Sequence, residues 1–329
     1  MSASGKGSPH ASIEPPDRLP SRRERLLPPR SLLILTGSAI YLSLIFGVML
    51  WRGVSIEPQW VVLALLLIAI ALGRGRSFIV DWLPFLVLFF AYEAMRGFAA
   101  KTGFAPHDLA TLEHDVFGPT LPTVWLQQTF YDPHVIGLQD WVGMFFYFMH
   151  FPLPIVVGFV FWIQSREHYR RFVAALLLMA FLGFVTYLFF PSTPPWLQFP
   201  CTEGLCPAGG VHKIIDETID KWGVSYYVSP LYSNLNPNRY AAFPSLHAAF
   251  PALAAIYAWN RYRLLAIGLT GWTAGVMLSI VYLGEHYVVD AIDGMLYVAV
   301  AALVVELVSR RFARRAPPGQ TPTLARPSA

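Results

Sequence analysis

The chain has 329 residues, of which 55% are apolar and only 13% are charged, and its formal net charge is +4. Soluble domains contain about 25% charged residues, and a soluble protein with this much apolar surface would aggregate. The charged residues are confined to short runs between long apolar segments, which is typical of a polytopic membrane protein. This composition argues against a soluble protein, and basic residues that flank apolar spans argue against a nucleic-acid partner.

Eight apolar runs along the chain predict an all-α, polytopic membrane helical bundle. These runs cover residues 31–51, about 59–72, 78–96, 141–163, 172–190, 243–259, 264–283 and 287–308. The membrane domain is therefore expected over residues 31–309. Residues 1–30 and 310–329 are rich in Pro and Arg, and they predict disordered cytoplasmic tails.

Two segments between the predicted spans are expected outside the hydrocarbon core. Residues 97–140 contain prolines and many ionisable side chains, and short helices at 107–117 and 123–130 are predicted at the level of the lipid headgroups. Residues 197–239 form a long polar loop with an amphipathic stretch around 211–222. We expect this second loop to influence the choice of substrate.

The distribution of Lys and Arg predicts the orientation of the chain. Most of them lie in the two tails and in the turns 73–77, 164–171 and 260–263, which all fall on one side of an eight-span arrangement. By the positive-inside rule, both termini are cytoplasmic, in the plasma membrane, and the polar loop faces outward. In an oxidising compartment, Cys201 and Cys206 in that loop would form a disulfide. They show no metal-ligand spacing.

The chemistry is concentrated between Tyr240 and Asp290. His247 and His286 are separated by two spans joined by a short basic turn, so both are expected at the same membrane face, here the outer one. Asp290 follows His286 by four positions, which places the two side chains on one face of a helix. Two histidines and a carboxylate at one membrane face predict a phosphoryl-transfer site.

Each of these residues has a chemical role in the hypothesis. Neutral His286 would attack phosphorus and form a phosphoenzyme, while Asp290 would accept the other ring N–H and fix the tautomer. His247 would protonate the leaving oxygen and then act as a base toward the incoming hydroxyl. The alternative is an interfacial histidine beside a structural His–Asp pair, although a carboxylate at membrane depth is costly unless it is paired or functional.

A phosphate site is predicted at the start of the helix that carries His247. Pro244 suits the first helical turn, the helix N-terminus favours an anion, and Ser245 adds a hydroxyl donor. Arg239 is the preferred cation for the phosphate. Arg96 and His150 are candidate substrate-binding residues. Arg96 would pair with Glu93, meet the phosphate or hold a lipid headgroup, and His150 lies within a predicted span and needs a polar partner.

Two motifs resemble signatures of the type 2 phosphatidate phosphatase superfamily. The sequence PSLH at 244–247 resembles its second signature, and residues 279–290 resemble its third, in which Ser precedes His by seven and Asp follows His by four. The resemblance implies that Ser279 contributes to phosphate binding and that His286, Asp290 and His247 hold the roles given above. The first signature, a Lys followed by Arg-Pro, is absent, and Ile280 replaces the Arg of the third.

The departures resemble the inositol-phosphorylceramide synthase branch of that superfamily. Its members carry a Pro-Pro-Trp segment like FPSTPPW at 190–196, followed by FPSLH and HYxVD. The resemblance covers roughly residues 80–305 and implies a six-helix catalytic core, with the first two spans as additions. It implies transfer of a phospho-headgroup between lipids, with no cofactor and no metal.

Three functions remain open at this point. The first is a membrane phosphotransferase with a lipid phosphodiester as donor and a lipid or polyol hydroxyl as acceptor. The second is a lipid phosphate or pyrophosphate phosphatase with water as acceptor, which would use the same residues. The third is a non-enzymatic transporter or lipid-binding scaffold, which would not need Ser245 or His247. The oligomeric state is not predicted.

Overall fold

The computed structural model describes residues 58–99, 103–150, 152–201, 206–223 and 238–315, with isolated positions between 33 and 47. Within these residues every regular element is a helix, and isolated β-bridges connect the loops. The predicted all-α bundle is confirmed. Most of the predicted first span, the predicted N-terminal tail and residues 316–329 lie outside the described residues. Residues 310–315, which were predicted as part of the disordered C-terminal tail, are helical. The bounds of the membrane domain stay a prediction.

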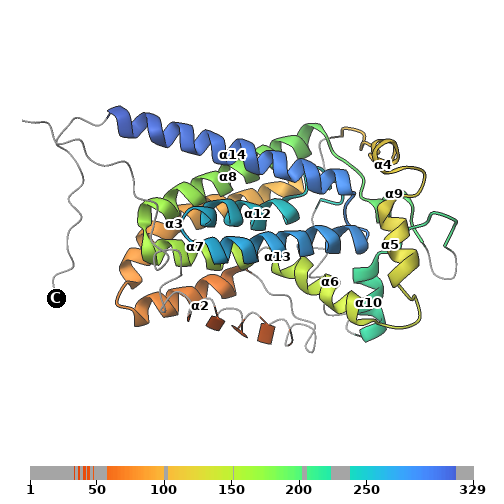
Figure 1. Cartoon of the computed structure of the whole chain (residues 1–329), viewed down its shortest axis with the longest axis horizontal. Helices are drawn as coiled ribbons and strands as arrows, with labels where there is room; N and C mark the ends of the chain where they lie inside the picture. The colour runs from red at the N-terminus through yellow and green to blue at the C-terminus, as the bar shows by residue number, and fades with distance from the viewer. Residues whose placement is uncertain are drawn as a thin grey trace, which may run out of the picture.

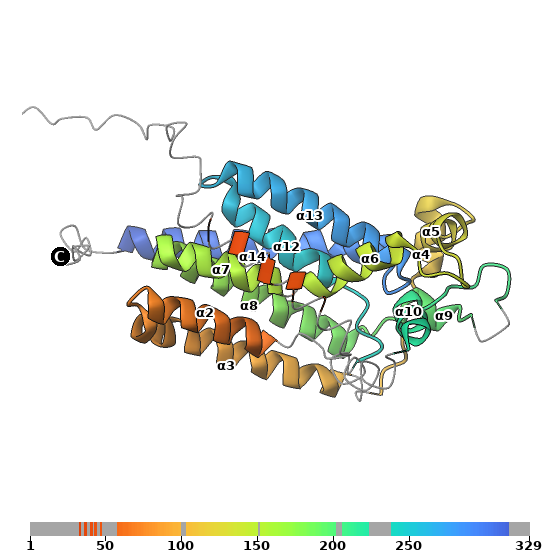
Figure 2. The ribbon, with the colours of Figure 1, turned by 90° about the horizontal axis from the view of Figure 1, so that it is seen from below.

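The long helices lie side by side and form one elongated bundle (Figures 1 and 2). Its members are α2 (Pro58–Ala71), α3 (Gly75–Ala99), α7 (Pro152–Gln164), α8 (Arg166–Phe189), α12 (Leu246–Trp259), α13 (Arg263–Tyr282) and α14 (Val288–Arg315). Helix α12 is central, because it packs against α13, α14, α8 and α7. Its alanines permit this close packing, which small residues favour in membranes.

Three of these helices are long and apolar enough to cross a membrane: Arg166–Phe189, Arg263–Tyr282 and Val288–Phe312. Helices α6 (Leu138–Met149) and α7 meet the same criteria together, as one bent pair. The chain is therefore a membrane protein. The expected total of eight spans stays a prediction, since α2 and α12 are shorter apolar helices.

The span predicted over residues 141–163 is not one straight helix. Helices α6 and α7 replace it, and their axes differ by 49°. The break lies next to Pro152, which lacks a backbone N–H and disfavours helical geometry at the residue before it. Pro154 removes a second donor from the same turn. The bend has a consequence for function, because it leaves His150 at the C-terminal end of α6, beside the site described below.

Short helices cover one end of the bundle, and we call them the cap: α4 (Ala110–Phe117), α5 (Pro122–Phe130), α9 (Pro195–Gln198) and α10 (Ile214–Trp222). Figures 1 and 2 show all four together at that end. Helix α4 contacts α14, α5 contacts α13, and α10 contacts α6. The sequence predicted short helices near α4 and α5 and an amphipathic stretch near α10, but no helix at α9. A disulfide joins Cys201 and Cys206 in the loop that precedes α10.

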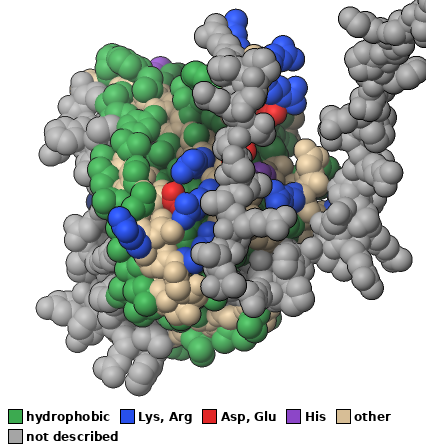
Figure 3. Space-filling model, turned by 90° about the vertical axis from the view of Figure 1, so that its left-hand side faces the viewer, with side chains coloured by type: hydrophobic (Ala, Val, Ile, Leu, Met, Phe, Trp, Pro, Cys, Tyr) green, Lys and Arg blue, Asp and Glu red, His purple; other side chains and the backbone are tan. Residues whose placement is uncertain are grey.

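The opposite end of the bundle is basic. Figure 3 views that end and shows Lys and Arg side chains gathered on it. The turns between α2 and α3, α7 and α8, and α12 and α13 all lie there, and so does the C-terminal half of α14. Cap and basic end are therefore separated by the full length of the helices, which matches the asymmetry expected from the sequence.

Candidate active site

The site is built where α12 and α14 begin. Ser245 is the N-cap of α12, and its backbone N–H donates to the carbonyl oxygen of Asp290 at 3.0 Å. One turn further along α14, a Cβ on Gly294 would lie 2.5 Å from the carbonyl oxygen of Ser245. The two helix starts thus touch through their backbones. This contact fixes the distance between the segment that carries His247 and the segment that carries His286.

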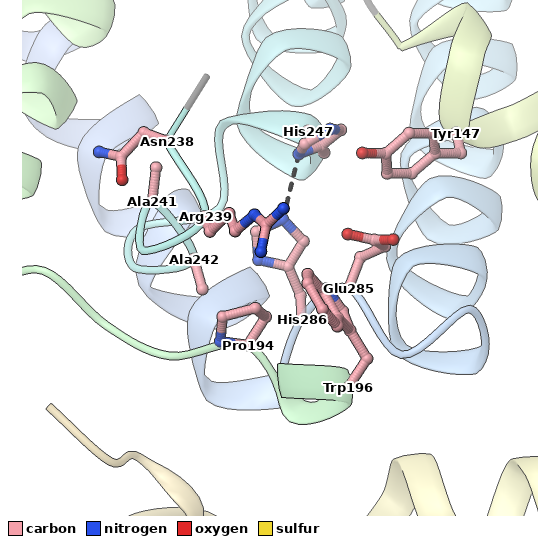
Figure 4. Close-up of a pocket in the computed structure, with 10 residues that line it drawn as sticks. All are labelled: Tyr147, Pro194, Trp196, Asn238, Arg239, Ala241, Ala242, His247, Glu285 and His286. Atoms are coloured by element: carbon pink, nitrogen blue, oxygen red, sulfur yellow. Dashed lines mark hydrogen bonds between the residues drawn. The ribbon is translucent and has the colours of Figure 1, made fainter. Parts of the chain in front are cut away.

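His286 lies between a carboxylate and the second histidine. Its Nε2 is 3.1 Å from Nδ1 of His247, so the two rings share a hydrogen bond (Figure 4). Its Nδ1 faces Oδ2 of Asp290 at 3.4 Å, which is an ion-pair distance but longer than a good hydrogen bond. His286 is 3% exposed and Asp290 is fully buried. One ring nitrogen of His286 therefore faces the Asp290 carboxylate and the other faces the ring of His247.

Asp290 also caps its own helix. Its Oδ2 accepts a hydrogen bond from the backbone N–H of Tyr287 at 2.9 Å. Helix α14 begins at Val288, so His286 precedes the helix rather than lying on its face, as the four-residue spacing had suggested. His286 still faces Asp290. The chain turns sharply just before it at Gly284, whose φ of +83° favours glycine.

His247 is packed among aromatic and imidazole rings. The ring of Tyr147 stacks on it with centroids 4.7 Å apart, and the ring of His150 lies 4.0 Å away on a tilted plane. His150 is itself held by the carbonyl oxygen of Tyr147 through its Nδ1. The bend between α6 and α7 therefore brings a third histidine, predicted as a substrate contact, against the pair.

A pocket opens over His247 and His286 (Figure 4). Arg239, the predicted phosphate cation, lines it and is exposed. Pro194 and Trp196 also line it. Both belong to the segment FPSTPPW, which stands in place of the superfamily's first signature. Glu285 contributes a carboxylate that is 5% exposed. The pocket therefore combines cationic, imidazole and acidic groups in one small space.

The start of α14 is capped from the outside by a residue far away in the sequence. Glu113 of α4 is fully buried, and its two carboxylate oxygens accept hydrogen bonds from the N–H groups of Val288 at 2.9 Å and Val289 at 3.0 Å. Burial raises the pKa of Glu113, and the two backbone hydrogen bonds act against that rise. These bonds satisfy donors that a helix start leaves unpaired. Glu113 therefore anchors the helix that positions Asp290.

The turn before His286 is held from the cap by Gln127 of α5. Its Nε2 donates to the carbonyl oxygens of Tyr282 and His212, both at 2.9 Å, and its Oε1 accepts from the N–H of His212 at 2.8 Å. The N–H of Trp196 donates to the carbonyl oxygen of Gly284 at 3.1 Å. Helices α5 and α9 thus bind the backbone turn that precedes His286, and α5 also binds the loop that carries His212.

The remaining predicted residues have different placements. The Oγ atom of Ser245 is buried and has no hydrogen-bond partner among the described residues, and Ser245 is not among the pocket-lining residues. Ser279 is buried near the end of α13, and it is not part of that lining either. The side chain of Arg96 lies outside the described residues.

Metal-ligand side chains gather in the cap. Within the described residues, the ligand atoms of Cys201, Cys206 and His212 lie within 4.8 Å of one another. Both cysteines are in the disulfide, so neither offers a thiolate, and Nδ1 of His212 is 2.9 Å from a carboxylate oxygen of Glu217. The chemistry of this group does not fit a metal centre while the disulfide is intact.

Comparison with known proteins agrees with this geometry. A family model described as the PAP2 superfamily matches residues 107–304, which contain the pocket, both histidines and the cap. The chain belongs to the PAP2 superfamily. It is thus a membrane enzyme of that superfamily.

Two curated relatives refine the placement within the PAP2 superfamily. The chain is 27% identical over 235 residues to the phosphoinositol dihydroceramide synthase of Bacteroides thetaiotaomicron, covering 67% of this chain and 74% of the relative. It is also 27% identical over 196 residues to the catalytic subunit of inositol phosphorylceramide synthase from Schizosaccharomyces pombe, covering 57% of this chain and 43% of that relative. No solved structure matches. These relatives support the predicted branch.

The sequence analysis missed three residues of this PAP2 site. Glu285 had a signal in the sequence, since a carboxylate next to a histidine at membrane depth is costly without a role. Glu113 had none, because its partner Val288 lies 175 positions away. Tyr147 was hidden by the expectation of a continuous apolar span.

Proposed function

We propose that this PAP2 protein is an integral membrane phosphotransferase, which moves a phospho-headgroup from a lipid phosphodiester to a hydroxyl acceptor through a phosphohistidine at His286. The observation that carries the proposal is the placement of His286, with Asp290 facing Nδ1 at 3.4 Å and His247 facing Nε2 at 3.1 Å. The names of the two relatives support a phosphoinositol headgroup and a ceramide-type acceptor.

In the first half-reaction the donor phosphate replaces the hydrogen bond between the two rings. Nε2 of His286 attacks phosphorus, and the bond from phosphorus to the lipid alcohol oxygen breaks. His247 gives its proton to that oxygen, which leaves as the free alcohol. Asp290 stabilises the positive charge that develops on the His286 ring. Arg239 neutralises the phosphate as it enters the pocket.

In the second half-reaction the acceptor hydroxyl attacks the phosphorus of the phosphohistidine. His247, now neutral, takes the hydroxyl proton, and the phosphorus–nitrogen bond breaks to restore neutral His286. Water in place of the alcohol would give hydrolysis with the same residues. Acceptor choice thus depends on which hydroxyl the pocket admits, because the chemical steps are identical.

The proposed orientation places this site outside the cytoplasm. The cap and the pocket lie at one end of the bundle and the basic turns at the other, so the positive-inside rule puts the basic end in the cytoplasm. Both termini are then cytoplasmic in a plasma membrane protein. The disulfide in the cap supports an oxidising compartment at that end.

A product assay tests the proposal. Purified protein in mixed-lipid vesicles is given labelled phosphatidylinositol, with and without a ceramide or other alcohol acceptor, beside the variant His286→Ala. We expect labelled product that requires the acceptor and is absent with the variant. Release of headgroup phosphate without an acceptor would favour the hydrolase, and full turnover by His286→Ala would contradict the mechanism. Turnover of no lipid phosphate would favour the non-enzymatic alternative.

A further inference from the structure

The pocket contains an acidic side chain that the proposed steps do not use. Glu285 lines the pocket together with His247 and His286, is 5% exposed, and immediately precedes the nucleophile in the chain. A carboxylate opposes the binding of a phosphate by charge repulsion. Its place in the pocket lining beside both histidines therefore points to a ligand group other than phosphate.

The backbone holds Glu285 in a fixed position. Its N–H donates to the carbonyl oxygen of Ile280 at 3.0 Å, and the following N–H of His286 donates to the same oxygen at 3.2 Å. Gly284 lies against the cap, where a Cβ would be 2.8 Å from the carbonyl oxygen of His212. The backbone therefore fixes the position of Glu285 relative to His286, as a residue that selects a substrate requires.

Glu285 lies in the acidic and aromatic half of the pocket. In Figure 4 its carboxylate lies between the ring of Tyr147 and the indole of Trp196, on the side of the histidines away from Asn238. The indole Nε1 of Trp196 is buried and has no hydrogen-bond partner among the described residues. This half therefore offers a strong acceptor and an unused donor, whereas Arg239 supplies the cation for phosphate.

We propose that Glu285 determines headgroup specificity: it accepts hydrogen bonds from the hydroxyls of a polyhydroxylated headgroup and disfavours phosphomonoesters. An ionised carboxylate only accepts hydrogen bonds, and hydroxyls are the complementary donors. A diester carries one negative charge and a monoester up to two, so repulsion by Glu285 is stronger for the monoester. This inference rests on the proposed function and names the residue that would select its donor.

The test compares three donor lipids that differ only in headgroup. Phosphatidylinositol has ring hydroxyls, phosphatidylpropanol is a diester without headgroup hydroxyls, and phosphatidate is a monoester. The kcat/KM of each is measured for the wild type, Glu285→Ala, Glu285→Gln and the matched control Glu167→Gln, an exposed carboxylate on α8 at the basic end. Thermal stability of every variant is recorded in the same detergent.

We expect the preference for phosphatidylinositol over phosphatidylpropanol to fall by about 10-fold or more in Glu285→Ala, through KM, because hydrogen bonds to a charged group are lost. Glu285→Gln, which keeps a carbonyl acceptor, should fall less. In both variants turnover of phosphatidate should rise relative to the diesters. An unchanged preference, or an equal loss for all three donors, would overturn the role of Glu285.

A binding measurement separates this inference from the proposed function. Glycerophosphoinositol, a soluble diester, is titrated calorimetrically into His286→Ala and into His286→Ala/Glu285→Ala, neither of which can turn over. Weaker binding to the double variant supports the headgroup role of Glu285. If the wild type then turns over no lipid donor, the proposed phosphotransferase function is overturned and the role of Glu285 is kept. If the wild type turns over donor but the two variants bind equally, the role of Glu285 is overturned and the proposed function is kept. Absence of both turnover and binding overturns both.

Discussion

The two ends of the bundle use carboxylates in opposite ways. At the cap end, Glu113 and Asp140 are fully buried and accept hydrogen bonds from backbone N–H groups at helix starts. At the basic end, the carboxylate of Asp81 pairs with Arg166 at 2.9 Å and with Arg170 at 3.4 Å. The Arg side chains there are 45% and 68% exposed, whereas the side chain of Asp81 is 5% exposed. The cap end therefore uses buried carboxylates to fix the backbone, and the basic end pairs a buried carboxylate with exposed Arg side chains.

This difference indicates where geometry matters. The Asp81 pairs join side chains to one another, and their exposed Arg partners can shift without moving the start of a helix. A buried carboxylate that caps a helix positions every residue in the next turn, and at the cap end that turn carries Asp290. Substitutions of the same chemical type should therefore impair activity at the cap end and only stability at the basic end.

The largest effect is expected from the nucleophile itself. His286→Ala removes the atom that would form the phosphohistidine, and loss of a nucleophile lowers kcat by about 10⁴-fold or more. The melting temperature is measured as well, because the variant leaves the buried carboxylate of Asp290 without the ring that faces it. The rate is measured with phosphatidylinositol and a ceramide acceptor, and acid-labile labelling of the wild type with radioactive headgroup phosphate is measured beside it. Stable labelling of the variant would contradict the assignment.

A glycine substitution tests the backbone contact that builds the site. In Gly294→Ala the new Cβ would lie 2.5 Å from the carbonyl oxygen of Ser245, so the starts of α12 and α14 must move apart. A displacement near 1 Å costs about 100-fold in rate, and overpacking costs about 1–3 kcal/mol.

The matched control is Gly271→Ala on α13, where a Cβ would meet no atom within 4 Å. This control should keep both activity and melting temperature. If Gly294→Ala retains the wild-type rate, close contact between the two helix starts is not needed for catalysis.

The fold explains which parts of this site could be predicted from the sequence. His247, His286 and Asp290 were accessible because a helical hairpin relates the two histidines and only four positions separate His286 from Asp290. The cap helices α4, α5 and α10 were indicated by polar runs interrupted by proline. Contacts such as Glu113 with Val288 were inaccessible, because they depend on how the cap docks onto the bundle and no periodic pattern encodes that docking.

The bend between α6 and α7 was missed for a different reason. Pro152 and Pro154 were visible in the sequence, but apolar residues on both sides of them favoured one continuous span. Proline is tolerated within membrane helices when neighbours satisfy the freed backbone groups, so hydropathy alone does not distinguish a kink from a break. The consequence was that His150 and Tyr147 were not placed beside His247.

The next prediction compares one buried carboxylate from each end. Glu113→Gln keeps the size of the side chain but replaces one carboxylate oxygen with an NH₂ group. That group cannot accept a hydrogen bond, so the N–H of Val288 or of Val289 loses its acceptor. We expect kcat to fall by about 10–100-fold and stability to fall by about 1–3 kcal/mol. KM should change little, because Glu113 is not part of the pocket lining.

The matched variant at the basic end is Asp81→Asn. It weakens the pairs with Arg166 and Arg170 and should lower the melting temperature without changing kcat per folded molecule. Both variants are measured in the same detergent by steady-state kinetics and thermal unfolding. An equal fall of kcat in the two variants would show that the ends are not distinct in the way the structure indicates.

The smallest effect concerns the attachment of α10 to the cap. Burial alone would raise the pKa of Glu217, but hydrogen bonds from His212 at 2.9 Å and from Tyr131 at 2.7 Å outweigh it, and the pKa lies below its ordinary 4.5. A lowered carboxyl pKa means that the stabilisation is present above pH 4.5 and is lost as the pH falls through the folded-state pKa.

Hydrogen exchange of α10 measured across this acid range should therefore show faster opening as Glu217 is protonated. Glu217→Gln should cost about 1 kcal/mol at neutral pH and remove most of the acid dependence of that exchange. The variant Glu167→Gln, whose carboxylate is exposed at the basic end, serves as the control and should leave α10 unchanged. Because the neighbouring Gln127 binds both His212 and Tyr282, opening of α10 should also loosen the turn before His286, and activity should decline over the same pH interval.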